Sequence, residues 1–308
     1  MEFVTKDIEP WLDRMFTYDN GSDTEVEYEP SSSTNDIGDI VVGEGYKIRM
    51  TDITKTLDIY GEKVETDYEF DIIKTYDIIG FLRITAGDVE DMFSDYVPDD
   101  IDWIKNEDGY IYWPDYSINQ ISDMEAGEGY TTAIKSGGST ITDFSYPWTA
   151  TKSYSLPREK QETIVYTDYY KTYYSMGVVI LPEAWDVYPE VGDEIGVFDS
   201  NNNLCGSAVY EGGITIFLSH GDDKDSDIKE GLNENEPITI KVYSALTNIE
   251  RIFEVESWEL GDGTFEVNKN CVANKIVETK PENNILFPVS PNPANDLVRL
   301  SFYLCEEG

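Results

Sequence analysis

Hydrophobic and polar residues alternate over short stretches in the second half of the chain, which is the pattern of half-buried β-strands. Between residues 164 and 277, clusters of Gly, Asn and Asp separate these stretches, as in antiparallel strands joined by tight turns. One cluster, DSNNN at 199–203, is predicted to be a hairpin loop. The pattern therefore predicts an antiparallel β-sandwich domain. The predicted strands lie within YSMGVVILP, DEIGVFD, LCGSAVY, ITIFLSH, PITIKVYSA and RIFEVESWEL.

The first half of the chain contains a repeat. Residues 37–46 read IGDIVVGEGY and residues 121–130 read ISDMEAGEGY, an offset of 84 positions. Upstream, DIEPWL from Asp7 matches DVEDMF from Asp88 at an offset of 81, which implies a three-residue insertion between the two matches. Because a match of this length and order is improbable by chance, we expect two tandem copies of one unit.

The second copy indicates what each unit contains. A β-prone run at 76–84 opens it, and a short helix is expected at 87–96 with Asp88 as its N-cap. The stretch 101–114 has two β-prone arms around an Asp-Gly pair, which favours a hairpin. The Gly-Glu-Gly-Tyr sequence then leads through a tight turn into another strand. The predicted fold class is mainly β, with tandem small β-rich repeat units, each with a short helix, followed by the antiparallel β-sandwich domain.

Composition shifts set the expected domain boundaries. The segment 147–163 is rich in Thr, Ser, Lys and Pro and breaks the periodicity, and a second polar segment follows the β-sandwich. The first copy enters at the equivalent of the helix, so we expect the chain to start inside a repeat. The expected domains are repeat 1 at 1–65 (N-terminally incomplete), repeat 2 at 66–146, a linker at 147–163, the β-sandwich at 164–277, a linker at 278–286, and the incomplete start of a further domain at 287–308.

The charge of the chain excludes several classes of partner. It carries 62 acidic and 22 basic residues, a net charge of −40. Nucleic acid would be repelled, and so would an anionic membrane surface. The longest apolar runs fall well short of the roughly 20 residues of a membrane-spanning helix, so no membrane span is expected. With 40% hydrophobic and 13% aromatic residues, the chain still has enough apolar material for a folded core.

Catalytic motifs are missing from the sequence. Its one histidine, His220, excludes metal sites built from several histidines. No nucleophile-elbow, phosphate-loop or dinucleotide-binding motif lies between a predicted strand and a helix. With 62 acidic residues, any carboxylate pair is uninformative about glycoside hydrolysis. We therefore expect a protein that is not an enzyme.

One acidic loop matches the spacing of calcium ligands. After His220, aspartates alternate and a glutamate follows at the twelfth position, as in an EF-hand loop. Ile228 stands where that loop needs Gly, and no helices are predicted beside it. Chance clustering in so acidic a chain is the alternative to a calcium site, and no other cofactor is expected. The candidate calcium ligands are Asp222, Asp223, Asp225, Asp227 and Glu234.

Aromatic residues and cysteines provide two weaker candidate sites. Four aromatic residues of repeat 2 offer a platform for stacking sugar rings, against the alternative that they pack between strands. Cys205 and Cys271 fall within one expected domain, and they either pair in an oxidising compartment or remain two buried thiols. The four aromatic residues are Trp103, Tyr112, Trp113 and Tyr130.

The C-terminal stretch carries a specific pattern. From residue 287 the chain reads FPVSPNPANDLVRLSFYLCEEG, a Pro-Asn-Pro turn that leads into a strand of alternating residues. It closely resembles the opening of the type A C-terminal sorting domain of proteins exported by the type IX secretion system of Bacteroidota. The chain stops where the rest of that domain is expected. The matching residues are Pro291, Asn292, Pro293, Asn295, Asp296, Glu307 and Gly308.

The upstream parts are also similar to modules common in such exported proteins. YIYWPDYSINQISDMEAGEGY at 110–130 resembles a repeat with a Tyr-Trp-Pro strand and a Gly-x-Gly-Tyr strand entry, although the first copy has Glu29 in place of the Trp. The second domain, with GDEIGVFD at 192–199, resembles a β-sandwich module found just before sorting domains. The resemblance implies the type IX secretion machinery as a partner and an extracellular or outer-surface location.

The N-terminus, MEFVTKDIEP, lacks the basic and apolar regions of a signal peptide. Because type IX cargo first crosses the inner membrane with such a signal, we expect this sequence to be the C-terminal portion of a longer exported protein. The expected function is that of a secreted or cell-surface structural or adhesive protein, with self-assembly into an extracellular filament or surface layer as one form. The alternative is a carbohydrate-binding accessory region of a secreted polysaccharide-degrading enzyme, whose partners are extracellular glycans.

Overall fold

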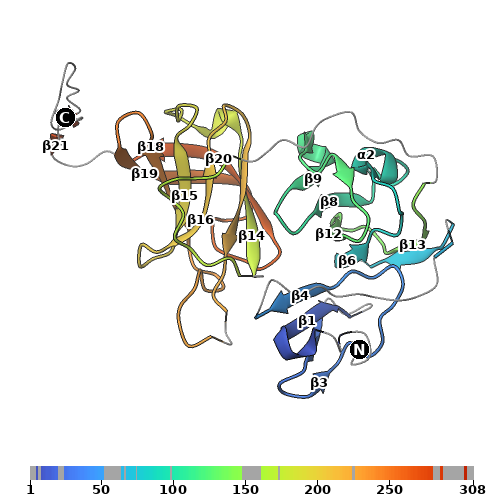
Figure 1. Cartoon of the computed structure of the whole chain (residues 1–308). Helices are drawn as coiled ribbons and strands as arrows, with labels where there is room; N and C mark the ends of the chain where they lie inside the picture. Colours follow the sequence, from blue (N-terminus) through green and yellow to red (C-terminus); the bar gives the residue numbers. More distant parts are fainter. Residues whose placement is uncertain are drawn as a thin grey trace. The chain divides into compact units, whose positions relative to one another are not determined.

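The computed structural model divides the chain into two compact units, residues 1–159 and 160–308 (Figure 1). The division falls within the segment that the sequence sets apart as a linker. Strands form most of the regular structure in both units, which confirms a mainly β chain. Among the described residues, no helix is long and apolar enough to cross a membrane. The structure describes residues 5, 8–19, 24–51, 64–65, 67–73, 75–97, 99–147, 161–172, 174–223 and 226–279, and the backbone at 285–286 and 302–303.

Repeat 1, blue in Figure 1, forms an antiparallel sheet with the order β3-β2-β1-β4 among its described residues. A short 3₁₀ helix, η1 (Glu9–Trp11), precedes the first strand. One apolar residue directly before η1 and three from the first two strands form a small buried core. These residues are Ile8, Leu12, Met15 and Tyr28. The strands are β1 (Leu12–Tyr18), β2 (Glu25–Glu29), β3 (Thr34–Asn35) and β4 (Lys47–Met50).

The main sheet of repeat 2 has strands equivalent to those of repeat 1 in the same order, with one strand added at its edge. Its described sheet has the order β10-β9-β8-β12-β6. Two short ladders accompany this sheet, one between β7 and β11 and one between β5 and β13. The strands are β5 (Phe70–Ile72), β6 (Tyr76–Gly80), β7 (Gly87–Asp88), β8 (Ile101–Lys105), β9 (Ile111–Trp113), β10 (Ile118–Asn119), β11 (Asp123–Met124), β12 (Gly129–Ile134) and β13 (Ile141–Phe144).

In repeat 2, the predicted helix N-cap and the predicted hairpin turn are both present in the structure. The helix α2 (Val89–Met92) begins after Asp88, whose side chain accepts a 2.8 Å hydrogen bond from the Glu90 N–H. Strands β8 and β9 form the expected hairpin, and Gly109 in its turn has a φ of +83°, a conformation that favours glycine. A second 3₁₀ helix, η2 (Pro114–Tyr116), then leads into β10.

The strand register shows that the two repeats are copies of one fold. Met15 pairs with Tyr28 in repeat 1, and Ile104 pairs with Tyr112 in repeat 2. The offset is therefore 89 for the first strand of this pair (104 − 15) and 84 for the second (112 − 28). The insertion that the sequence suggests is thus the net result of two changes. Residues are added before β8, and fewer are removed from the hairpin that follows it.

Two side chains hold the same turns in both copies. In repeat 1, the Asn35 side chain accepts a hydrogen bond from the Gly38 N–H at 3.0 Å, and the Tyr46 hydroxyl accepts one from the Val41 N–H at 2.8 Å. Their equivalents in repeat 2, 84 positions later, make the same bonds at 2.9 Å each. These contacts give a structural reason for the Asn and Tyr matches between the two copies.

Unit 2 is built around one sheet, with the order β16-β15-β18-β19-β20-β14-β17 in its described residues. Neighbouring strands are antiparallel except β14 and β20, which are parallel. The two end strands approach each other, because a Cβ on Gly206 of β16 would lie 2.1 Å from the Leu218 carbonyl oxygen of β17. The expected sandwich therefore takes the form of a single curled sheet rather than two separate ones. Its elements are β14 (Ser175–Ile180), η3 (Pro182–Ala184), β15 (Glu194–Phe198), β16 (Leu204–Val209), β17 (Thr215–His220), β18 (Thr239–Ser244), β19 (Ile249–Leu260) and β20 (Asn270–Glu278).

The core of unit 2 contains the two cysteines for which a disulfide was one prediction. Trp185 packs edge-to-face on Phe253, with ring centroids 5.2 Å apart. Cys205 and Cys271 are buried in the same core, and both are free thiols. Their strands, β16 and β20, are not neighbours in the sheet order. Burial raises the pKa of each thiol to about 12. The disulfide prediction is therefore corrected: these cysteines pack as small apolar residues.

The hairpin predicted at 199–203 is confirmed, because this loop joins the antiparallel strands β15 and β16. Asn202 in the loop has a φ of +67°, which asparagine tolerates. Near the C-terminus, β21 (Ile285–Leu286) pairs with β22 (Phe302–Tyr303). The motif that resembles a sorting domain lies outside the described residues: Pro291, Asn292, Pro293, Asn295 and Asp296.

Candidate functional site

Strand β6 joins the two repeats. On one edge it pairs with β12 of its own repeat. On its other edge it meets the Gly-Glu-Gly segment of repeat 1. There the Gly45 N–H donates to the Ile78 carbonyl at 2.6 Å, and the Gly80 N–H donates to the Gly43 carbonyl at 2.9 Å. Backbone hydrogen bonds therefore cross the boundary between the repeats, and the two copies share one strand.

The two Gly-Glu-Gly segments differ in what surrounds them. Gly45 of repeat 1 is buried, whereas Gly129 at the equivalent position of repeat 2 is exposed. A Cβ on Gly45 would lie 2.6 Å from the Ile78 side chain and 3.0 Å from the Ile79 backbone. A Cβ on Gly129 would approach no atom closer than 3.7 Å. Close approach of the two repeats thus requires glycine at position 45, whereas position 129 has room for a larger residue.

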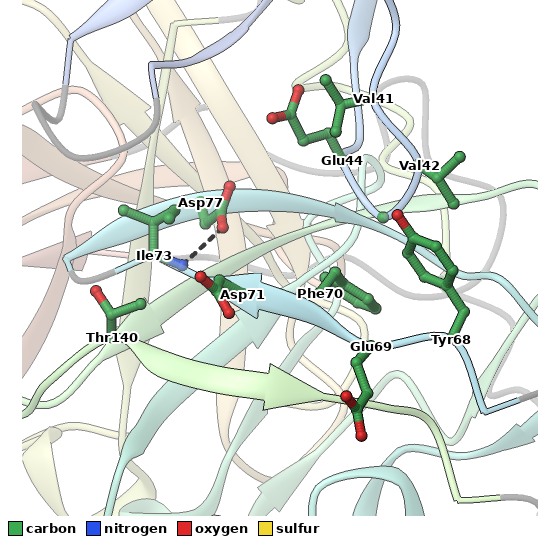
Figure 2. Close-up of a pocket in the computed structure, with 11 residues that line it drawn as sticks. Val41, Val42, Glu44, Tyr68, Glu69, Phe70, Asp71, Ile73, Asp77 and Thr140 are labelled. Carbon is green, nitrogen blue, oxygen red and sulfur yellow. Dashed lines mark hydrogen bonds between the residues drawn. The ribbon is translucent and has the colours of Figure 1, made fainter.

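A pocket of about 560 Å³ opens beside this junction (Figure 2). Its wall comes from the Gly-Glu-Gly segment of repeat 1, from β5 and from β6. Carboxylates and apolar groups share the lining, and the residue Tyr68 is 39% exposed. Carboxylates accept hydrogen bonds from hydroxyl groups, and aromatic rings pack against sugar rings. The lining residues are Val41, Val42, Gly43, Glu44, Tyr68, Glu69, Phe70, Asp71, Ile73, Asp77 and Thr140.

Asp77 is the buried carboxylate of this pocket; Figure 2 shows its hydrogen bond with the Ile73 backbone. Its two oxygens accept hydrogen bonds from the Ile73 and Ile78 N–H groups, at 2.8 Å each. Burial raises the pKa of Asp77 to about 7 against the effect of these two donors, and the nearby Glu44 raises it further. The charge of this carboxylate therefore changes close to neutral pH.

Lys105 on β8 is a buried cation. It is 4% exposed, and its Nζ has no hydrogen-bond partner within the described residues. The ammonium lies 5.1 Å from the centroid of the Trp103 ring. Burial lowers the pKa of Lys105 to about 7, and the positive charge of Lys47 also lowers it. A substantial fraction of this amine is therefore neutral at pH 7.

The four aromatic residues predicted to stack on sugars are not on the surface. Each is almost completely buried in repeat 2, and the Trp113 Nε1–H donates to Asp102 at 3.1 Å. Because their faces are covered by other residues of the repeat, they offer no stacking platform, and this prediction is corrected. The strands that carry them place these rings among packed residues. The exposed fractions of Trp103, Tyr112, Trp113 and Tyr130 are 3, 7, 1 and 2%.

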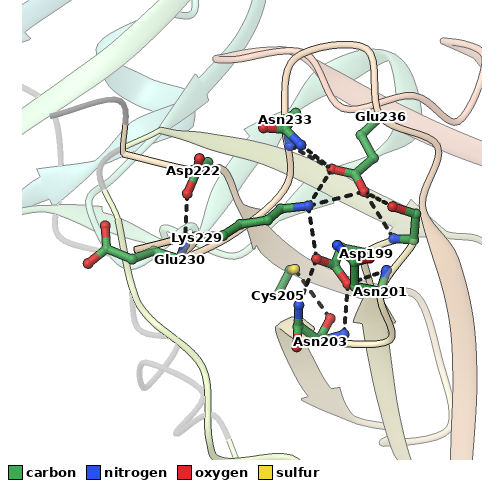
Figure 3. A network of polar contacts seen from close by, with 10 residues as sticks. Asp199, Asn201, Asn203, Cys205, Asp222, Lys229, Glu230, Asn233 and Glu236 are labelled. Carbon is green, nitrogen blue, oxygen red and sulfur yellow. Dashed lines mark hydrogen bonds and ion pairs between the residues drawn. The ribbon is translucent and has the colours of Figure 1, made fainter. Parts of the chain in front are cut away.

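In unit 2, a lysine organises the acidic loop that follows β17 (Figure 3). The Nζ of Lys229 lies 3.0 Å from a carboxylate oxygen of Asp199 and 3.0 Å from one of Glu236. Asp199 opens the hairpin between β15 and β16, and Glu236 ends the acidic loop. Both carboxylates are buried. One ammonium group therefore ties the acidic loop to the neighbouring hairpin.

The Glu236 carboxylate is held by several donors at once. It accepts hydrogen bonds from the Asn233 N–H at 2.9 Å and from the Ser200 N–H at 3.0 Å, in addition to Lys229. Burial acts to raise its pKa, but these donors outweigh burial and lower the pKa of Glu236 to about 2. Donors of the hairpin and Lys229 likewise outweigh burial at Asp199, whose pKa is lowered. Both carboxylates are therefore ionised at neutral pH.

The five predicted calcium ligands come from this same loop. Within its described residues, no group of three or more His, Cys, Asp or Glu side chains is placed to hold a metal ion. One of the five, Asp222, accepts a 2.7 Å hydrogen bond from the Glu230 N–H. The calcium hypothesis stays a prediction. Asp223 is buried, Asp227 and Glu234 are exposed, and Asp225 lies outside the described residues.

A carboxylate that the sequence did not single out fixes the start of unit 2. Glu194 on β15 is 5% exposed, and it accepts four hydrogen bonds of 2.8–3.0 Å from the backbone N–H groups of residues 164–166. In the sequence, Glu194 is one of many acidic residues beside an apolar run. Its partners lie about thirty positions away along the chain, so no local signal identifies it.

Comparison of the chain with protein-family models, with curated proteins and with solved structures finds no match. The function is therefore inferred from the residues of the chain itself.

Proposed function

We propose that this chain is a non-catalytic structural or adhesive part of an exported cell-surface protein, in which tandem β units hold one another in register. The observation that carries the proposal is the shared strand β6, which bonds to both repeats. Domains joined only by a linker usually move independently, whereas backbone hydrogen bonds across a boundary resist such motion. The resemblance of residues 287–308 to a sorting domain supports an extracellular or outer-surface location, with the type IX machinery as partner.

Separating the two repeats costs free energy because strand β6 contributes both backbone hydrogen bonds and buried side chains to their contact. The hydrogen bonds of Gly43 and Gly45 to β6 would break together. Ile78 and Ile79 of β6, which are 2% and 1% exposed, would also be uncovered in part. Burial of such a side chain stabilises a fold by roughly 1.5–3 kcal/mol. The junction therefore suits a protein that transmits force along its length.

The mechanical role is tested by pulling the full chain from its two ends in optical tweezers. Repeats 1 and 2 should extend in one unfolding event, because β6 belongs to both. The Gly45→Ala variant should extend in two events, because its Cβ would lie 2.6 Å from the Ile78 side chain. Gly129→Ala, the equivalent change at an exposed site, is the matched control and should behave as the unaltered chain. Two separate events in the unaltered chain would rule the proposal out.

Export is tested separately in cells. The protein that carries this chain, produced in a Bacteroidota strain with a type IX system, should be digested when protease is added to intact cells. Replacement of Pro291 and Asn292 by alanine should leave it protected, because the residues that resemble the sorting motif are removed. A protein that is protected from protease without any substitution would contradict the proposed location.

Carbohydrate binding is a second candidate function, and the pocket beside the junction favours it. Tyr68 presents a partly exposed ring there, next to the carboxylates of Glu44, Glu69 and Asp71. A glycan array probed with the full chain tests this function. Retention of a glycan by the chain, and its loss in Tyr68→Ala, would support a carbohydrate-binding accessory role. An array without any retained glycan removes it.

A further inference from the structure

Strand β4 of repeat 1 and strand β12 of repeat 2 are equivalent, but their neighbours differ. At the offset of 84, residues 47–50 correspond to residues 131–134. Strand β12 lies between β8 and β6, whereas β4 is the last strand of its sheet among the described residues. Within the part of repeat 1 that the structure describes, the edge of the sheet that β6 covers in repeat 2 is therefore left open along β4.

The exposure of the two strands reflects this difference. The four residues 131–134 of β12 are all buried, and Thr132 is 0% exposed. None of the four residues of β4 is buried. Ile48, the equivalent of Thr132, is 39% exposed. Repeat 2 thus provides an internal reference for an edge that a neighbouring strand occupies, and among the described residues no strand occupies the corresponding edge of repeat 1.

The hydrogen-bond pattern identifies which backbone groups of β4 face the open edge. In repeat 2, the Phe81 N–H donates to the Glu128 carbonyl at 2.9 Å, in register with the β6–β12 ladder. In an antiparallel ladder every second residue bonds the same neighbour, so residues 130 and 132 bond β6 and residues 131 and 133 bond β8. By equivalence, Tyr46 and Ile48 direct their backbone groups to the open edge.

We propose that the open edge of β4 is a binding site for an extended peptide strand of the β6 type, which adds to the sheet in antiparallel orientation. The chemistry of the occupant follows from β6 itself, which completes the same register in repeat 2. It is an apolar strand with one carboxylate and a glycine, as in Tyr76–Gly80. In the register of repeat 2, Ile79 of such a strand lies opposite Tyr46, and Asp77 lies opposite Ile48.

The two basic residues of β4 are compatible with this occupant. Lysine on an edge strand usually discourages pairing. Here the Lys47 ammonium lies over the Phe16 ring, 5.6 Å from its centroid, and Arg49 is ion-paired with Asp13 of β1. Both side chains are therefore engaged within repeat 1. They also lie on the face of β4 opposite to Ile48, so neither blocks the Asp77 position of the occupant, which is opposite Ile48 in this register.

The test uses the full chain and a synthetic peptide with capped ends and the sequence of residues 75–81, Thr-Tyr-Asp-Ile-Ile-Gly-Phe. Amide hydrogen exchange is followed residue by residue by NMR, with and without the peptide. The peptide should slow exchange at Tyr46 and Ile48 by about tenfold or more. Exchange at Lys47 and Arg49, whose backbone groups face β1, should change little. Unchanged exchange at Tyr46 and Ile48 overturns the proposal.

Two N-methylated peptides provide the matched control. A methyl group on the nitrogen at the Ile79 position removes an N–H that faces β4, so protection should be lost. The same group at the Ile78 position faces away from β4, so protection should remain. Equal effects of the two peptides would overturn strand pairing. Amide exchange at Ile48 could also be slow without peptide and become slower as the protein concentration rises. That result would assign the edge to a second copy of the chain and would likewise overturn the proposal. None of these readouts depends on the mechanical role of the junction.

Discussion

A single register position shows how far the two repeats have diverged in chemistry. Phe16 lies opposite Lys47 in repeat 1, and Lys105 lies opposite Thr131 in repeat 2. Phe16 is 2% exposed and Lys105 is 4% exposed, so the same buried position holds a ring in one copy and an amine in the other. A buried amine without a hydrogen-bond acceptor loses its hydration and gains little in return. Repeat 2 is therefore less stable than its packing alone implies.

Replacement of Lys105 by methionine should raise the free energy of unfolding. The folded pKa of about 7 is below the ordinary value of 10.5, so the unfolded chain binds more protons between these pH values and the stability of the unaltered chain rises with pH. The gain in Lys105→Met should therefore shrink by about 2 kcal/mol between pH 7.5 and pH 9.5. Urea unfolding at both pH values measures this. A gain that does not vary with pH would contradict the burial of a charged amine.

Asp77 should give the opposite pH dependence. Its folded pKa of about 7 is above the ordinary value of 3.8, so the folded chain binds more protons between these pH values and becomes less stable as the pH rises. The unaltered chain should lose about 2 kcal/mol relative to Asp77→Asn between pH 5 and pH 7. Urea unfolding at intervals across this range measures the difference. Parallel pH profiles for the two proteins would contradict it.

At the scale of elements, Lys229 connects a hairpin to a loop through two buried carboxylates. Lys229→Met would remove the one cation that the structure shows at both buried carboxylates, Asp199 and Glu236. Because Lys229 itself is exposed to solvent and both carboxylates keep other hydrogen-bond donors, the expected loss in the free energy of unfolding is about 1.5–3 kcal/mol. Chemical denaturation followed by fluorescence measures this loss.

The matched control for this change lies in repeat 2. Lys135 pairs with Asp115 at 2.6 Å, but half of the surface of the Asp115 side chain is exposed. Solvent screens such a pair, so Lys135→Met should lower stability by at most about 1 kcal/mol. Equal losses of unfolding free energy in the two variants would show that the Lys229 ion pairs stabilise the fold no more than an exposed ion pair does.

At the scale of the whole molecule, the net charge of −40 means that acidic groups repel one another. Dissolved salt weakens their repulsion without specific binding, whereas a calcium site would bind one kind of cation. If the acidic loop binds calcium, millimolar calcium should raise the melting temperature more than sodium chloride of equal ionic strength. The effect should disappear with chelator and in the double variant Asp227→Asn, Glu234→Gln. Equal melting temperatures in the two salts would remove the calcium hypothesis.

The sequence predicted those features that depend on neighbouring residues. Asp88 as N-cap, the turn at Gly109 and the hairpin at 199–203 each follow from a few adjacent side chains and their backbone preferences. It also identified the repeat, because equivalent turns need the same Asn and Tyr in both copies. Features that depend on distant residues were missed, among them the burial of the Lys105 amine and the hydrogen bonds from residues 164–166 to Glu194.

The sequence alone determined that the chain is mainly β, acidic and repeated, because alternation, charge and self-similarity are all properties of the linear order of residues. Only the tertiary structure decided which strand covers which edge. It placed β6 between the two repeats, buried the aromatic residues of repeat 2, kept Cys205 and Cys271 apart, and set Lys229 between two carboxylates. Each of these results depends on contacts between segments far apart along the chain, and packing selects such contacts from many that the local pattern allows equally well.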